Sequence, residues 1–305
     1  MNTSVLTSVF TAFAPVFLLI GAGWVLRASN YMPATFWSGI NALNYRVLLP
    51  AVLFTTLARL DVSTSGLAAT ALAAGLASLV MIALGLGAAR LLRLAHGAAA
   101  PLIGAAALWN VVLVMALSER LFGAASAAST AAAVGAGIIV GTLCMVTVFA
   151  IRRPSGAARR IVTDPVVLAA LAGLALAFAG LEVPQAVMSG FEMAGAGALA
   201  VILLSMGAGL DFKALSGRVA PLSLAAVLRC LISPLVFAGL GLALHVESAQ
   251  LAVLILAGAA PGAAYLYAMT AEFDGEAGLA AGMITLTVIV AALVMPIVAI
   301  IGLSL

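Results

Sequence analysis

Long apolar runs alternate with short polar breaks along the whole chain. The runs are about as long as a membrane-spanning helix, which needs about 20 apolar residues, and they are rich in Ala, Leu and Gly. Strands of a membrane barrel would be about 10 residues long with alternating polarity, a pattern that is missing here. The sequence therefore predicts ten spanning helices, at residues 5–26, 36–58, 66–89, 98–118, 126–151, 162–181, 190–210, 219–243, 250–271 and 277–303.

Composition excludes the soluble classes of protein. Of the 305 residues, 65% are apolar and 8% are charged, whereas a soluble domain has about 45–50% and about 25%. Disorder, nucleic-acid binding and soluble catalysis do not fit these values. Metalloprotease, nucleophile-elbow and phosphate-loop motifs are absent from the sequence, so we expect neither an enzyme nor a cofactor. Cys144 and Cys230 lie inside apolar runs and are expected to be packing residues.

The basic residues separate onto the two sides of the predicted helices. Nine lie in loops that follow odd-numbered spans, and two lie in loops that follow even-numbered spans. Loops rich in Lys and Arg stay in the cytoplasm, so both termini are expected outside, with a cytoplasmic loop at 152–161. The nine are Arg27, Arg90, Arg93, Arg152, Arg153, Arg159, Arg160, Lys213 and Arg218, and the two are Arg59 and Arg120.

The chain also repeats itself with an offset of 150 to 152 residues. Five spans per half is an odd number, so the second half must be inserted upside down. Inverted repeats of this kind are typical of secondary transporters that bind their substrate near the bilayer midplane. We expect one repeat at 1–151 and the other at 162–305. The matching segments are 14–16 with 164–166, 33–39 with 184–190, 60–61 with 210–211, and 116–123 with 268–275.

Two arginines and a proline interrupt apolar spans, where polar groups are costly and therefore suggest function. Pro50 is expected to kink the second span, and Arg46, one turn earlier, has a guanidinium that suits a carboxylate. Alternatively, Arg46 could extend toward the membrane surface or pair with Glu192. Arg229 in the eighth span could neutralise the charge of a substrate or pair with an acid.

The fourth and ninth spans hold the strongest candidates for a binding site. Asn110 offers a donor and an acceptor to an anion, or it could join two helices. Pro261 and Gly262 are expected to open the ninth helix, so that the half-helix after them presents its partially positive N-terminus to an anion. A simple kink is the alternative. Tyr265 and Tyr267 are two residues apart, so only one of them is expected to line the site.

Several of these stretches resemble the auxin efflux carrier family, which includes plant auxin exporters and bacterial malate or malonate permeases. The resemblance covers the whole chain and depends on the order of short apolar motifs. These motifs are Pro15–Gly23, Leu48–Phe54, Ala200–Leu210, Arg229 with Ser233-Pro234, Ala260-Pro261 and Met295-Pro296.

The resemblance implies an all-helical, polytopic membrane protein of ten helices in two inverted repeats. Helices one, two, six and seven would form a scaffold, and helices three to five and eight to ten a transport domain. The fourth and ninth helices would be broken and would cross, with Asn110 and Pro261 at the family's positions. The family's fourth helix usually has Gly and Pro after that asparagine, and residues 111–121 have neither.

The leading hypothesis is a secondary transporter that moves a small organic anion, a carboxylate, by alternating access. Asn110 and the backbone at Pro261-Gly262 would hold the carboxylate, while Arg46 or Arg229 would balance its charge. Protons and Na⁺ are the candidate coupling ions, and the family suggests a homodimer in a bacterial inner membrane, surrounded by lipid. The alternatives are an anion channel, a sensor that does not transport, and a sodium-coupled symporter of the bile-acid type, which shares the architecture.

Overall fold

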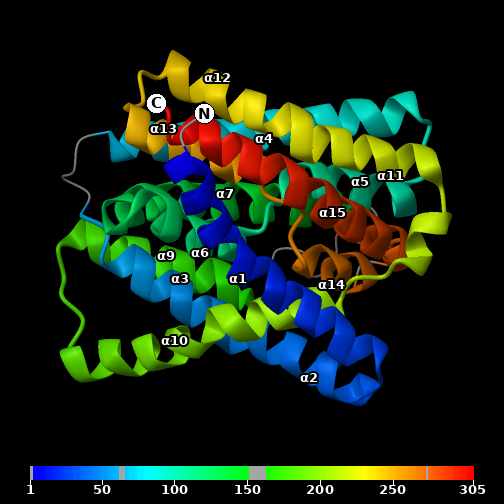
Figure 1. Ribbon diagram of the computed structural model, residues 1–305, viewed down its shortest axis with the longest axis horizontal. Helices are drawn as coiled ribbons and strands as arrows, with labels where there is room; N and C mark the ends of the chain where they lie inside the picture. The colour runs from blue at the N-terminus through cyan, green and yellow to red at the C-terminus, as the bar shows by residue number, and fades with distance from the viewer. Residues whose placement is uncertain (1–2, 62–65, 151–162, 273) are drawn as a thin grey trace.

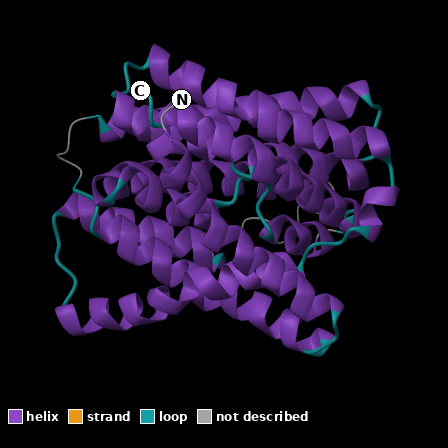
Figure 2. Cartoon of the chain, in the orientation of Figure 1, coloured by secondary structure: helices purple, strands orange, loops and turns teal. Residues whose placement is uncertain are grey.

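The structure is a computed structural model that describes residues 3–61, 66–150, 163–272 and 274–305. All regular elements in these ranges are helices, as Figure 2 shows. The predicted loop at 152–161 lies outside the described residues. Within the described residues, seven helical segments are long and apolar enough to cross a membrane: Val5–Ala28, Thr35–Ala58, Leu67–Leu91, Ala124–Met145, Gln185–Ala208, Val219–Ala243 and Ala277–Gly302.

The helices follow the predicted order of spans. In chain order they are α1 (Thr3–Ala28), α2 (Ala34–Leu43), the π-helix η1 (Asn44–Leu48), α3 (Leu49–Ala58), α4 (Leu67–Leu91), α5 (His96–Ala107), α6 (Val111–Phe122), the 3₁₀-helix η2 (Ala124–Ser126), α7 (Ala127–Ala150), α9 (Pro165–Ala179), α10 (Gln185–Ala208), the 3₁₀-helix η3 (Lys213–Ser216), α11 (Val219–Ala226), the π-helix η4 (Val227–Ile232), α12 (Ser233–Ala243), α13 (Ser248–Ala259), α14 (Tyr265–Glu272) and α15 (Ala277–Gly302).

Three of the predicted spans are not single long helices. The fourth consists of α5 and α6, which are interrupted at 108–110, and the ninth consists of α13 and α14, which are interrupted at 260–264. The sixth is the 15-residue helix α9. It begins directly after Asp164, whose carboxylate accepts hydrogen bonds from the first amides of the helix and so fixes its start. The fourth helix is therefore broken although it lacks the family's Gly and Pro.

The helices pack in two groups. In one group, α10 packs against α1 and α3, and α3 packs against α9. In the other, α4 packs against α5, α7 and α12, and α13 packs against α12 and α15. Figure 1 shows α2, α3 and α10 on one side of the molecule and α4, α11 and α12 on the opposite side. The resemblance assigns the helices of the first group to a scaffold and those of the second to a transport domain, and this division stays a prediction.

Glycines bring α1 and α10 into backbone contact. A Cβ atom on Gly23 would overlap the carbonyl of Leu204, and one on Gly207 would overlap the carbonyl of Ile20. Small residues permit such close approach between helices in a membrane, where packing replaces the hydrophobic effect. A larger residue at Gly23 or Gly207 would therefore push these two helices apart.

The interrupted helices lie in the most buried part of the protein. Every residue in 100–114 and in 250–263 is buried, which includes the first interruption and all of the second except Ala264. Apolar side chains from α4, α7, α12 and α15 surround them. Backbone that leaves the helix at membrane depth is tolerated only where protein or a cavity covers it. This enclosure makes the two interruptions possible.

Candidate functional site at the helix crossover

The two interrupted helices meet at their interruptions. The backbone N–H of Asn110 donates to the carbonyl of Pro261 at 2.9 Å, and the N–H of Ala263 donates to the carbonyl of Leu108 at 3.0 Å. Together they form one antiparallel bridge between two segments about 150 residues apart in sequence. Each interruption therefore supplies hydrogen-bond partners that the other lacks, and we refer to residues 108–110 and 260–264 as the crossover.

Asn110 itself starts α6. Its side-chain oxygen accepts a hydrogen bond from the N–H of Leu113 at 3.0 Å, which is the arrangement of a strong N-cap. Its side-chain nitrogen lies 3.0 Å from the sulfur of Met206 on α10, and the residue is 6% exposed. A thioether is a weak acceptor, so the side-chain N–H of Asn110 has a poor partner and can donate to a stronger acceptor instead.

Whereas a side-chain cap begins α6, a proline and its neighbours end α13. Ala260 adopts an extended conformation, as the residue before a proline prefers, and Pro261 has no N–H with which to continue the helix. The N–H of Gly262 donates to the hydroxyl of Thr287 on α15 at 3.2 Å. Gly262 has no positive φ, so its backbone conformation does not require glycine.

Both α6 and α14 begin at the crossover, so two helix N-termini lie there. Each carries a partial positive charge that favours an anion, although the N–H groups of Leu113, Leu266 and Tyr267 already donate within their own turns. At the start of α14, Ala264 is exposed and Tyr265 is half-buried, with its hydroxyl 3.5 Å from that of Thr142 on α7. Tyr267 is 50% exposed, so the two tyrosines differ in burial, while the expectation that only one lines a site stays a prediction.

The predicted cation Arg229 lies behind the crossover rather than in an open site. Its side chain is fully buried, and its guanidinium donates to the carbonyls of Ala106, Ala257 and Gly258 and to the hydroxyl of Ser233. Within the described residues no acidic side chain pairs with it. Its three carbonyl acceptors belong to the ends of the interrupted helices, whereas Ser233 begins α12.

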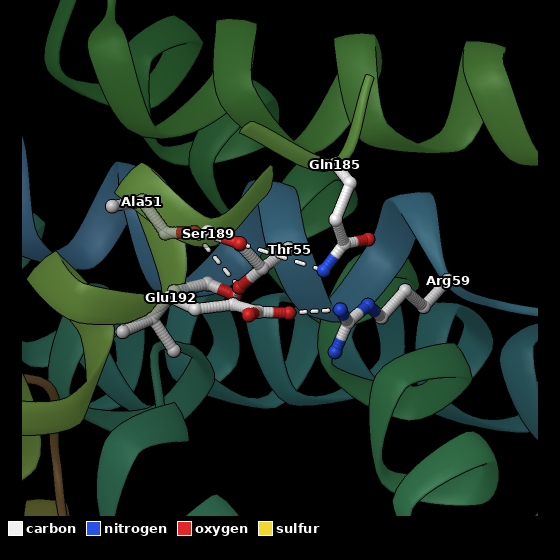
Figure 3. A network of polar contacts seen from close by, with 7 residues as sticks. Ala51, Thr55, Arg59, Gln185, Ser189 and Glu192 are labelled. Atoms are coloured by element: carbon white, nitrogen blue, oxygen red, sulfur yellow. Dashed lines mark hydrogen bonds and ion pairs between the residues drawn. The ribbon is translucent and has the colours of Figure 1, made fainter. Parts of the chain in front are cut away.

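The structure does not bring Arg46 to the crossover. Arg46 lies on the exposed face of η1, which packs against α2, α3, α9 and α10. Its suggested partner Glu192 instead forms an ion pair with Arg59 at the end of α3 (Figure 3), so an Arg46–Glu192 pair is not formed. Pro50, where a kink was expected, is the second residue of α3 and directly follows the π-helical turn.

A cavity of about 530 Å³ approaches the crossover between α1, α6 and α10. It includes Leu203, one turn along α10 from Met206, the residue that contacts the Asn110 amide. A second cavity of about 520 Å³ lies between α3, α7 and α10, beside the Arg59–Glu192 pair. The first is lined by Pro15, Val16, Leu19, Ala116, Glu119, Arg120, Ala196, Leu199, Ala200 and Leu203.

Several residues near the crossover were not singled out from the sequence. Thr287 could have been found as a polar residue within an apolar span. Met206 and Thr142 carry no signal, because only the fold brings them to Asn110 and Tyr265. The hydroxyl of Tyr45 donates to Asp164 at 2.5 Å, and the ring of Tyr45 lies 5.9 Å from that of Tyr265. Asp164 is therefore connected to Tyr265 through Tyr45, although Asp164 lies at the start of α9.

Interrupted helices that meet at their interruptions are typical of membrane transport proteins, and the comparison with known families agrees. The model of a family described as "Membrane transport protein" matches residues 8–163 and 155–299. The chain belongs to this auxin efflux carrier-like family, which confirms the resemblance found from its motifs. None of the curated proteins compared with the chain matches it.

Proposed function

We propose that the protein is a secondary transporter that carries a small organic anion with a carboxylate group by alternating access. The observation that carries the proposal is the crossover, where the N-termini of α6 and α14 and the amide of Asn110 come together. Because this region is buried, the dipoles of the two helices and of the amide can attract an anion without a mobile cation beside it.

Asn110 would bind the substrate directly. A carboxylate oxygen is a much stronger acceptor than the sulfur of Met206, so an arriving anion can replace that sulfur as the partner of the amide. The cavity between α1, α6 and α10 offers a route to within one turn of this contact. Pro261 and Gly262 would contribute the opened backbone, and Tyr265 a hydroxyl beside the start of α14.

The proposed architecture is ten spans in two inverted repeats, 1–151 and 162–305. Glycine contacts support the repeat. Gly23 on α1 meets the carbonyl of Leu204 on α10, and Gly173 on α9 meets the carbonyl of Phe54 on α3. Gly173 follows Gly23 by 150 residues, and Leu204 follows Phe54 by 150. A pseudo-twofold axis relating two repeats produces such a pair of matching contacts.

Contacts between helix ends support the proposed topology. The hydroxyl of Thr70 donates to the side chain of Gln250 at 3.1 Å, and both residues are expected at the outer face. Arg218 binds Glu276 at 2.7 Å, and the N–H of Glu276 donates to the carbonyl of Gly97 at 2.9 Å. These three are expected at the cytoplasmic face, so residues assigned to one face contact each other.

Alternating access would move one helix group past the other. Both cavities lie between the groups, because each has α10 with α1 or α3 on one side and α6 or α7 on the other. We propose α1, α2–α3, α9 and α10 as the scaffold and α4–α7 with α11–α15 as the moving domain.

Uptake into proteoliposomes tests the proposal. The purified protein is reconstituted, and uptake of labelled malate, malonate and indole-acetate is measured against protein-free vesicles. We expect saturable uptake of at least one of these, with counterflow when the vesicles are preloaded with unlabelled substrate. Uptake without saturation or counterflow would identify a channel instead. Thermal stabilisation by a carboxylate without uptake would identify a sensor.

A further inference from the structure

The interruption of α5 leaves a backbone carbonyl without its helical donor. In a continuous helix, the carbonyl of Ala106 would accept from the N–H of Asn110, four residues later. That N–H donates instead to Pro261 across the crossover. The carbonyl of Ala106 therefore needs another donor in a region where water is excluded.

The interruption of α13 does the same to two carbonyls. The carbonyl of Ala257 lacks its usual i+4 donor because Pro261 has no N–H, and within the helix it accepts only a long hydrogen bond of 3.3 Å from the N–H of Ala260. The carbonyl of Gly258 would accept from Gly262, but that N–H donates to Thr287. Both carbonyls belong to the C-terminal end of a half-helix, where the helix dipole places a partial negative charge.

All three carbonyls are bound by one side chain. The guanidinium of Arg229 donates to Ala106 at 3.1 Å, to Ala257 at 3.3 Å and to Gly258 at 2.6 Å. The hydroxyl of Ser233 is a fourth acceptor. These oxygens, supplied by two broken helices and one hydroxyl, form a cation site that already contains a cation.

The electrostatic setting of Arg229 supports this interpretation. The guanidinium lies 5.9 Å from the centre of the Phe237 ring, an arrangement that favours a cation. It is fully buried, and no carboxylate pairs with it within the described residues. The negative ends of α5 and α13 are therefore its countercharge. Arg229 cancels these ends, while the positive ends of α6 and α14 remain available to an anion.

Secondary transporters commonly bind a coupling cation with carbonyls at half-helix C-termini. We infer that Arg229 is a fixed cation in this place, so that the crossover needs no Na⁺ bound there to accept its substrate. Arg229 is a positioning residue: it ties α5 to α13 and acts on the substrate only through the crossover. The inference about transport rests on the proposed function, whereas the inference about the cation site does not.

Melting experiments in detergent test the cation site without any transport. We expect the apparent melting temperature of the wild type to be the same in NaCl and in choline chloride. Arg229→Ala should melt several degrees lower, and methylguanidinium or Na⁺ should recover at least half of that loss. Arg90→Ala, which removes an exposed arginine at the end of α4, should show no such recovery. If neither cation stabilises Arg229→Ala more than this control, the carbonyls are not a cation site.

Two further variants separate the effect of charge from the effect of hydrogen bonding. They also test the inference if Arg229→Ala does not fold. Arg229→Lys keeps the charge, whereas Arg229→Gln keeps donors without the charge. We expect carboxylate uptake by the lysine variant to exceed that by the glutamine variant at least tenfold. Equal uptake by the two would overturn the fixed-cation role, as would a wild type whose uptake falls tenfold when choline replaces Na⁺.

The two hypotheses fail in different ways. A wild type that transports none of the carboxylates contradicts the proposed function, but the melting experiment still decides whether Arg229 fills a cation site. In that case, the order of melting temperatures replaces uptake, and Arg229→Lys should melt above Arg229→Gln. The reverse order would contradict the inference.

Discussion

The interruption between α5 and α6 depends on one residue, whereas the interruption between α13 and α14 depends on two. Asn110 caps α6 and also directs its amide toward α10, so one residue both breaks the helix and offers the polar group. At the other interruption, Pro261 breaks the helix and Thr287 binds the freed amide of Gly262. The two tasks are joined at the first interruption and divided at the second.

This difference determines whether a substitution changes stability, binding or both. A change at Asn110 affects stability and binding together unless the new side chain can cap, while changes at Pro261, Gly262 or Thr287 affect the two properties separately. The predictions below test this division, beginning with the largest expected effect.

Asn110→Ala has the largest expected effect. It removes the cap, worth about 1 kcal/mol, and the amide that would bind a charged group, worth about 2 kcal/mol. Uptake at low substrate should fall roughly 30-fold, because the amide contributes about 2 kcal/mol to binding and 1.4 kcal/mol is about tenfold. Asn110→Ser separates the two losses because serine also caps helices. It should keep the melting temperature of the wild type and still lose most uptake. A serine variant with normal uptake would exclude Asn110 from the substrate site.

Thr287→Val should have the next largest effect, on stability rather than on binding. It leaves the buried N–H of Gly262 without an acceptor, which costs about 2 kcal/mol. The apparent melting temperature in detergent should drop by several degrees, and Thr287→Ser should restore it. If the valine variant melts like the wild type, the hydrogen bond to Gly262 does not hold the second interruption.

Pro261→Ala should cost about 1 kcal/mol. Part of the loss arises because alanine leaves the unfolded chain more freedom than proline does. The new N–H can also compete with Arg229 for the carbonyl of Ala257. A melting temperature a few degrees lower is expected, with Pro296→Ala in α15 as a control proline away from the crossover. An increase in stability would mean that the break at Pro261 is strained rather than favoured.

Gly262→Ala should have the smallest effect, below about 0.5 kcal/mol, as for substitutions that meet no special feature. A Cβ atom would lie 3.4 Å from the hydroxyl oxygen of Thr287 and 3.9 Å from the carbonyl oxygen of Ala105, both ordinary contacts. Melting and uptake should both be close to the wild type. A strong loss of uptake at unchanged stability would instead show that the substrate approaches this glycine closely.

The sequence predicts the interruption at Pro261 better than the interruption at Asn110, because the second of these needs a partner that is distant in sequence. Pro261 breaks a helix whatever surrounds it, so its effect can be read from residue type alone. The break at Asn110 requires the carbonyl of Pro261 as a partner, and that partner is 151 residues away in sequence. Without the fold, Asn110 resembles any polar residue within a span.

The two arginines within spans show a second limit. Arg46 and Arg229 both precede a proline by one turn or slightly more, and from the sequence both were candidates for charge balance. The structure exposes one and buries the other. The acceptors of Arg229 are backbone carbonyls, which every residue has, so no pattern of side chains could reveal them. Apolar patterning predicts which segments are helices, but not which side of a helix faces the crossover.

The π-helical turn at η4 makes the length of this segment as important as its composition. Its hydrogen bonds join residues five apart, so the turn holds one residue more than an α-helical turn. Deleting one residue from 230–232 would convert the wide turn into an α-helical turn, and it would shorten the spacing between Arg229 and Ser233 from four residues to three. Arg229 could then no longer bind the carbonyls of Ala106, Ala257 and Gly258 and the hydroxyl of Ser233 together. Single-residue deletions here should be far more harmful than apolar substitutions at the same positions.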